Sequence, residues 1–247
     1  SAKKQDIVSD FNVIKEVLSL GADNGKTNPS GKSEIHPVYL DAGINEYEYL
    51  EDYQDAIKDQ LGVFGLKGSS SVMASLILKH QFILVPDVRL AYATVNATGR
   101  CYSYTSYAEV GWQSFDDMMD HGLAAIMESC HTHADIPHFL IIQNINISYV
   151  PTYLQPLLDA VAGYVISIPG TDLILPENLR IIGIVTPDTG LPIPMSCLRI
   201  MGCYPKDKIF EIEKTGVKAV FKKYLSLTNI DSFKEDDIEM SSDEYYK

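Results

Sequence analysis

Apolar runs and amphipathic stretches alternate along the middle of the chain, from residue 61 to about residue 200. The run FLII at 139–142 is apolar throughout, which is typical of a strand covered on both faces of a parallel sheet. The same pattern predicts strands at 61–64, 82–85, 139–142 and 179–185, and helices at 72–79, 114–129 and 150–163. Strands that alternate with helices in this way favour an α/β fold with a mainly parallel sheet.

The two ends of the chain differ from this middle part. Apolar residues at helical spacing predict a helix over 1–20, and an acidic amphipathic pattern predicts another over 46–60. Residues 21–37 are rich in Gly, Asn, Ser and Pro and therefore indicate a loop. The remaining predictions are a hairpin or β-rich insertion at 164–175, a helix at 213–227 and an acidic, solvated tail at 231–247.

Composition narrows the class of protein. A share of 46% hydrophobic residues among 247 is ordinary for a globular protein and suffices for a substantial core. The net charge of −13 argues against a surface that coats nucleic acid, because phosphate binding needs clustered Lys and Arg. The four cysteines lack CxxC spacing, and no apolar run approaches the ~20 residues that cross a bilayer. We therefore expect a soluble, cytoplasmic protein with reduced thiols.

Three segments follow one another in a characteristic order. An aromatic stretch, CYSYTSYAEVGW at 101–112, precedes IPHFLIIQNINISYV at 136–150, and LPENLRIIGIVTPDTG follows at 175–190. Upstream, Phe64–Val72 holds a Gly-rich turn between a predicted strand and a predicted helix. In this order and spacing, residues 61–203 resemble the McrB-type (restriction NTPase-like) branch of the AAA+ family.

The resemblance implies a P-loop AAA+-like three-layer sandwich with a mainly parallel sheet. In this interpretation, residues 1–60 form a helical and loop-rich N-terminal extension, and residues 61–205 form the α/β core. Residues 206–230 are then a short helical remnant of a truncated C-terminal lid, and residues 231–247 are the acidic tail.

The nucleotide-binding loop that the resemblance implies is degenerate. A P-loop needs a Lys that reaches the β- and γ-phosphates and a Ser or Thr hydroxyl that binds Mg²⁺. In this chain Ser71 takes the position of the Lys, Val72 takes that of the Thr, and Lys67 lies four residues too early. The predicted remnant of the nucleotide-binding site consists of Gly65, Lys67, Gly68, Ser69, Ser70 and Ser71.

The other catalytic positions of the family are also replaced. Gln143 and Asn144 stand where the family's Walker B acids hold Mg²⁺ and polarise water, and neither is a base at neutral pH. Thr186 stands at the sensor-1 position, and Arg199 is the candidate for the arginine finger. We therefore predict no catalytic residue and no required cofactor, while binding of ATP or GTP without hydrolysis stays open.

Two further features have alternative interpretations. Gly25-Lys26-Thr27 and Gly31-Lys32-Ser33 look like Walker A ends, but each spacing is one residue off, which favours a flexible loop. A cluster at 130–138 is either a plain turn before a strand or a zinc site, although zinc ligands usually stand roughly two to five residues apart. Its candidate ligands are Cys130, His131, His133 and His138.

The predicted function is that of a pseudo-NTPase, an AAA+-like protein that has lost hydrolysis and binds other proteins. Its partners would be related AAA+ subunits or copies of itself, in a ring or another assembly, with no direct contact to nucleic acid or membrane. One alternative is an active, divergent ATP- or GTP-dependent motor subunit of restriction type, in which Lys67 reaches the phosphates and Asp188 or Asp135 binds Mg²⁺. A second alternative is a metal-binding interaction module built on residues 130–138.

Overall fold

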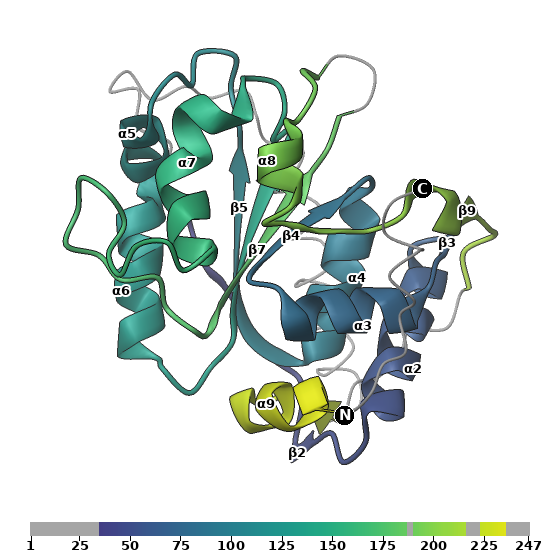
Figure 1. Cartoon of the computed structure of the whole chain (residues 1–247). Helices are drawn as coiled ribbons and strands as arrows, with labels where there is room; N and C mark the ends of the chain where they lie inside the picture. The colour runs from purple at the N-terminus through teal and green to yellow at the C-terminus, as the bar shows by residue number, and fades with distance from the viewer. Residues whose placement is uncertain (1–34, 187–189, 216–222, 236–247) are drawn as a thin grey trace. The chain divides into compact units, whose positions relative to one another are not determined.

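The computed structural model describes residues 35–186, 190–215 and 223–235. Within them, six strands form one sheet in the order β1-β5-β6-β7-β4-β8 (Figure 1). Five of these strands run parallel, and β1 is antiparallel to its neighbour β5. The strands are β1 (Val38–Asp41), β4 (Phe82–Val85), β5 (Arg100–Tyr107), β6 (His138–Gln143), β7 (Leu179–Ile184) and β8 (Gly202–Cys203). The predicted α/β class with a mainly parallel sheet is confirmed.

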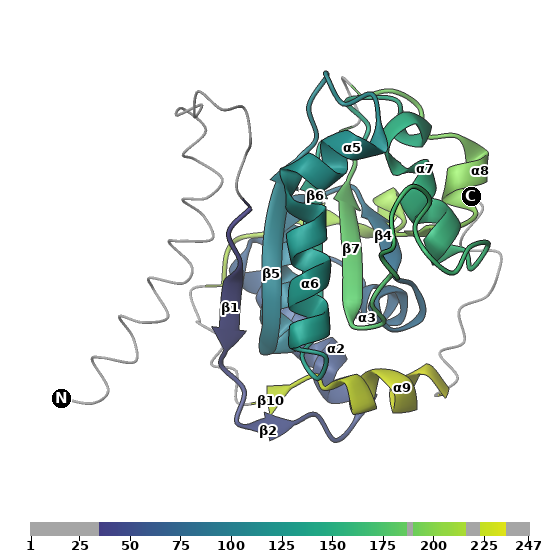
Figure 2. The same cartoon turned by 90° about the vertical axis from the view of Figure 1, so that its left-hand side faces the viewer.

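Helices cover both faces of this sheet (Figures 1 and 2). One layer contains α5 (Phe115–Met118), a π-helical turn (Met119–Leu123), α6 (Ala124–Thr132) and α7 (Val150–Val161). The other layer contains α2 (Leu50–Val63), α3 (Ser70–Lys79) and α4 (Val88–Thr98), with α9 (Leu227–Glu235) beside α3. The short helix α8 (Met195–Leu198) follows β7. Among the helices of these described ranges, none has the length and apolar character needed to span a membrane.

The central strands are buried on both faces. Every residue of β4 and β7 is buried, including Arg180, whose guanidinium is the one charged group in these two strands. The Nε of Arg180 donates to the carbonyl oxygen of Ile77 at 2.8 Å, and Nη1 donates to that of Glu177 at 2.7 Å. Burial lowers the pKa of Arg180. These carbonyl contacts offset the cost of removing its charge from water.

Short pairings join the segments that flank the sheet. Strand β2 (Asn45–Glu46) pairs with β10 (Lys223–Tyr224), and β3 (Leu66–Lys67) pairs with β9 (Phe210–Glu211). A 3₁₀ turn, Lys206–Lys208, precedes β9. In the region predicted as a helical remnant, the described residues 206–215 and 223–230 hold these short pieces and the start of α9 at Leu227.

Several predicted elements are wrong. Residues 61–63 end helix α2 and form no strand, because Ile57 and Leu61 continue its buried stripe. No strand forms in 164–175, where the chain makes turns and bends. The helix predicted at 213–227 is contradicted at 223–224, which form strand β10. The single helix predicted at 114–129 is interrupted at Gly122, which has a φ of 96°.

Other predictions agree with the structure or lie outside it. Strand β4 occupies the predicted range 82–85, and β6, β7, α3 and α7 lie within two residues of their predicted bounds. Helix α4 and strands β1 and β5 were not predicted. The helix at 1–20, the two Walker A-like motifs at 25–33, Asp188 and residues 236–247 lie outside the described residues.

Gly99 ends helix α4 and lies against β10. Its φ is 73°, and a Cβ at this position would overlap the backbone oxygen of Lys223. We expect Gly99→Ala to lower the free energy of unfolding by about 2 kcal/mol, because the left-handed conformation and the overlap are both unfavourable. Gly111→Ala is the matched control, since no atom lies within 4 Å of its Cβ position. Urea denaturation of both variants measures the difference, and equal stabilities would contradict it.

A candidate functional site at the carboxyl edge of the sheet

The parallel strands β4, β6 and β7 all end at the same edge of the sheet, at the top of Figure 1. In open α/β sheets, ligands bind outside the carboxyl ends of the strands. The residues that follow these three strands are therefore the first place to look for function. They include three of the residues that the sequence singles out, Gln143, Asn144 and Thr186.

The turn from β4 to α4 contains only Pro86 and Asp87, with no glycine. Asp87 is the N-cap of α4, and its Oδ1 accepts a hydrogen bond from the backbone N–H of Arg89 at 2.8 Å. The Arg89 guanidinium lies 2.7 Å from Asp87 Oδ2 and 3.0 Å from Glu211 Oε1. The hydrogen bonds that Arg89 donates raise the pKa of its guanidinium, and the bond to Asp87 has a larger effect than the bond to Glu211. A carboxylate of the chain itself thus occupies the positive end of this helix.

Gln143, at the end of β6, lies between two tyrosines. Its Nε2 donates to the hydroxyl of Tyr107 at 3.1 Å and to that of Tyr92 at 3.3 Å. Tyr107 ends β5 and Tyr92 belongs to α4, so this network joins three elements. Burial raises the pKa of both tyrosines, which keeps them neutral at pH 7. This position carries no charge that would bind a cation.

Asn144 and Thr186 meet directly at the same edge. The Oγ1 of Thr186 donates to Oδ1 of Asn144 at 2.8 Å. Asn144 has a φ of 55°, a conformation that Asn tolerates better than most residues. Asn146 holds the loop that follows β7. Its Oδ1 accepts a hydrogen bond from the Thr186 backbone N–H at 2.8 Å. Its Nδ2 donates to the backbone oxygens of Thr186 and Leu191, both at 3.1 Å.

The Gly-rich segment 65–71 lies beside the amino end of α4, where a Cβ at Gly68 would come 3.5 Å from Leu90. It precedes β4, and β3 belongs to a separate two-stranded sheet with β9 rather than to the main sheet. Ser69 is the N-cap of α3 and accepts a hydrogen bond from Val72 N–H at 3.4 Å, while its own N–H donates to the Tyr204 hydroxyl at 2.6 Å. Lys67 and Ser71 are exposed, and Gly65, Gly68 and Ser70 complete the segment. The segment is connected to the turn after β4 through Glu211, which pairs in register with Leu66 and lies 3.0 Å from Arg89.

Arg199, the candidate for the arginine finger, is exposed directly after α8. In the chain it lies between β7 and β8. The residues that sequence reasoning missed are Asp87 and Tyr92. A short Pro-Asp link between an apolar strand and a helix would have been the signal for Asp87.

The cluster at 130–138 is divided among different environments. Cys130 is buried in the core, which raises the pKa of its thiol to about 12, whereas His131 is exposed. His133 contacts the ring of Tyr102, with centroids 4.8 Å apart. His138 is fully buried and its Nδ1 lies 2.9 Å from the oxygen of Ile136, while burial lowers its pKa. In the part of the chain that the structure describes, no three His, Cys, Asp or Glu side chains are grouped so as to hold a metal ion.

Comparisons of the chain with protein-family models, with curated proteins and with solved structures found no match. The chemistry of the carboxyl edge therefore has to be judged from its own residues. What they offer is one carboxylate bound to an arginine and a set of neutral hydrogen-bonded amides and hydroxyls.

Asp87 should contribute measurably to stability. We expect Asp87→Ala to lower the free energy of unfolding by about 1–2 kcal/mol, mostly from the lost N-cap and partly from the half-exposed ion pair with Arg89. Asp87→Asn keeps the capping oxygen and loses only the charge, so it should cost less than about 1 kcal/mol. Urea denaturation compares the two variants. An equal loss of stability in both would show that the cap is not what Asp87 contributes.

Proposed function

We propose that this chain is a catalytically degenerate AAA+-like protein, a pseudo-NTPase, that acts by binding other proteins as a component of a ring or another assembly. Four kinds of observation support the proposal: the order of the strands, the chemistry of the turn after β4, the uncharged residues that follow β6 and β7, and the apolar surface around the carboxyl edge.

The strand order supports the AAA+ interpretation. Numbered along the chain, the five parallel strands are β4, β5, β6, β7 and β8, and their order in the sheet is 2-3-4-1-5. Read from the other edge this is 5-1-4-3-2, the order of AAA+ cores. In such a core the phosphates bind at the turn after the first parallel strand. In this chain that turn is Pro86–Asp87, whereas the segment 65–71 precedes the first parallel strand in the chain.

The Asp87 carboxylate disfavours nucleotide binding at this turn. A phosphate at a helix N-terminus is held by free backbone N–H groups and the helix dipole, usually with a nearby cation. Here Asp87 accepts the Arg89 N–H, and Arg89 is already paired with two carboxylates. Two like charges 4 Å apart repel by roughly 4 kcal/mol near a protein surface. Arg89 offsets part of this repulsion, but because it is shared between Asp87 and Glu211 the group keeps a net negative charge that disfavours a phosphate at this turn.

The neighbouring residues support loss of hydrolysis. Mg²⁺ prefers carboxylate ligands and attack by water needs a base, whereas Gln143, Asn144 and Thr186 carry no charge. Gln143 Nε2, Asn144 Oδ1 and Thr186 Oγ1 each take part in a side-chain hydrogen bond within the chain. The edge is therefore better suited to holding its loops in place than to chemistry.

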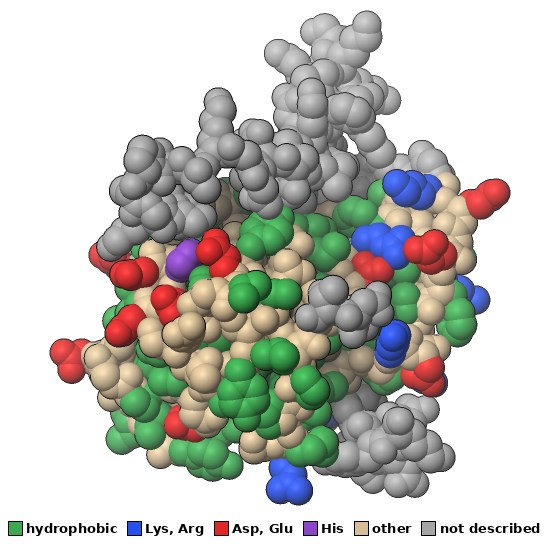
Figure 3. All heavy atoms as spheres, turned by 90° about the horizontal axis from the view of Figure 1, so that it is seen from above, with side chains coloured by type: hydrophobic (Ala, Val, Ile, Leu, Met, Phe, Trp, Pro, Cys, Tyr) green, Lys and Arg blue, Asp and Glu red, His purple; other side chains and the backbone are tan. Residues whose placement is uncertain are grey.

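Apolar side chains around the carboxyl edge support a role in protein binding. Viewed from above, this face carries many hydrophobic side chains (Figure 3). Large apolar residues of its loops are strongly exposed: Val110 (75%), Met195 (58%), Tyr149 (48%) and Leu191 (45%). The loops are joined, because the Ser148 hydroxyl contacts the oxygens of Glu109 and Val110 at 3.0 and 2.9 Å. Exposed apolar patches of this kind mark interaction surfaces.

Thermal melting with and without nucleotide tests this function. A ligand present at 100 times its dissociation constant stabilises the folded state by about 2.7 kcal/mol, which is easily detected. We expect no change of melting temperature with Mg-ATP or Mg-GTP relative to Mg²⁺ alone. Nucleotide-dependent stabilisation, or ATP or GTP turnover that Lys67→Ala abolishes, would contradict the proposal.

A further inference from the structure

The distribution of charge along the chain is uneven. Residues 101–179 contain no Lys and no Arg, although the whole chain has 20 of them. The same stretch contains nine acidic residues, Glu109, Asp116, Asp117, Asp120, Glu128, Asp135, Asp159, Asp172 and Glu177. Such a long stretch of one sign produces a field that attracts cations and cationic partners.

This stretch includes one whole helical layer of the fold. Residues 101–179 form most of β5, then α5, α6, β6, α7 and the loop that leads to β7. Helices α5, α6 and α7 lie together on one face of the sheet, opposite α2, α3 and α4 (Figures 1 and 2). The part of this surface that residues 101–179 contribute therefore carries acids and no Lys or Arg.

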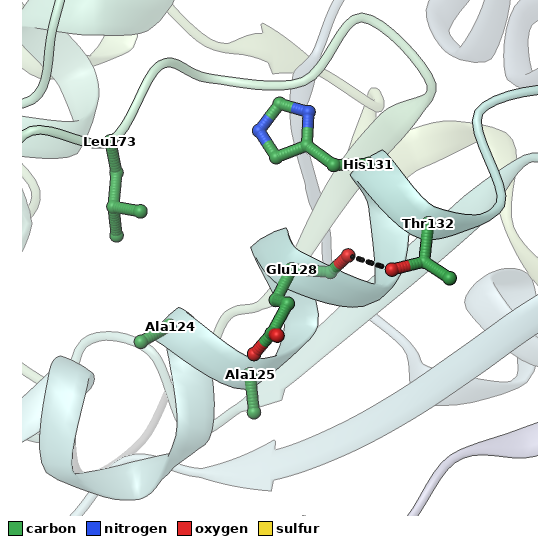
Figure 4. Close-up of a pocket in the computed structure, with 6 residues that line it drawn as sticks. All are labelled: Ala124, Ala125, Glu128, His131, Thr132 and Leu173. Atoms are coloured by element: carbon green, nitrogen blue, oxygen red, sulfur yellow. Dashed lines mark hydrogen bonds between the residues drawn. The ribbon is translucent and has the colours of Figure 1, made fainter.

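A groove lies on this layer, between α6 and the loop before β7 (Figure 4). Its volume is about 580 Å³, and it is lined by Ala124, Ala125, Glu128, His131, Thr132 and Leu173. Both alanines belong to α6, Ala124 is drawn on the side of Leu173, and Leu173 comes from the loop. The same loop exposes Ile166 (87%) and Ile174 (55%) to solvent.

We propose that this groove binds an amphipathic helix of a partner protein, one that carries Lys or Arg beside its apolar stripe. Small side chains such as Ala124 and Ala125 allow the backbone of a second helix to approach closely, and Leu173 offers an apolar contact. An amphipathic helix in an apolar groove is a recurring mode of recognition. The exposed carboxylate of Glu128 and the surrounding acids select a basic helix and disfavour an acidic one.

The charge of the chain argues against a second copy as the occupant. The whole chain has a net charge of −13, and the described helix α2 on the opposite layer is itself rich in acids. A copy of the same chain would therefore repel the groove over most orientations. The inference does not depend on the loss of nucleotide binding, because α6 lies on the opposite face of the sheet from α4 and its Asp87 cap.

Fluorescence anisotropy with designed peptides tests this inference on the full chain. The probe is a labelled amphipathic helix with Leu at i, i+3, i+4 and i+7 and Lys beside them, and the matched peptide replaces each Lys with Glu. We expect the Lys peptide to bind at least about tenfold more tightly than the Glu peptide at low salt, and its binding to weaken as salt rises. Equal binding of both peptides, or no binding of either, would overturn the inference.

Three variants locate the binding site. Glu128→Lys should weaken binding of the Lys peptide by about tenfold, and Ala125→Trp should do the same by filling the groove. Asp55→Lys makes the same charge reversal at an exposed position of α2, on the other layer, and should leave the affinity unchanged. Melting temperatures show whether each variant is folded. In the native chain, NMR shifts of the Ala124 and Ala125 methyl resonances on addition of the Lys peptide locate the binding site without any substitution. If Asp55→Lys weakens binding as much as Glu128→Lys, or these methyl resonances do not move, the groove is not the site.

Discussion

The contact between the Asp87 carboxylate and the first turn of α4 determines what the carboxyl edge of this sheet can do. Strand β4 lies between β7 and β8 and is buried at every residue, so the chain must leave it through a very short link. Asp87 makes that link compatible with a helix by capping α4, and Arg89 is shared between Asp87 and Glu211. The same arrangement places a negative charge at the helix end that would otherwise attract an anion.

The rest of the edge is built from neutral groups that bind one another. Gln143 connects α4, β5 and β6 through Tyr92 and Tyr107, and the pair of Asn144 and Thr186 connects the ends of β6 and β7. Neutral, satisfied networks of this kind rigidify a structure without offering a site for a metal ion or a proton transfer. Rigid loops can in turn present exposed apolar side chains such as Val110 and Tyr149 to a partner.

The sequence predicted secondary structure well where burial requires a run of apolar residues, and less well elsewhere. Strands β4, β6 and β7 were predictable because strands buried on both faces must be apolar. Helix α4 was not predictable, because its buried Thr94 and Thr98 are polar. In the structure their hydroxyls donate to the backbone oxygens of Leu90 and Thr94, four residues earlier in each case. In the site, Asn144 and Thr186 meet because they follow two strands that are neighbours in the sheet. The Gly-rich sequence at 65–71 instead marks the start of helix α3. Asp87 belongs to no sequence motif.

The central claim is that Asp87 excludes phosphate from the turn after β4, and equilibrium binding measures this most directly. Isothermal titration calorimetry with Mg-ATP and Mg-GTP should be carried out on the native chain and on Asp87→Asn, which retains the cap and removes the charge. The account predicts no saturable binding by the native chain at nucleotide concentrations of about 1 mM. A binding free energy more favourable than about −4 kcal/mol would be visible at that concentration. Saturable binding by the native chain, with the same affinity in Asp87→Asn, would contradict it.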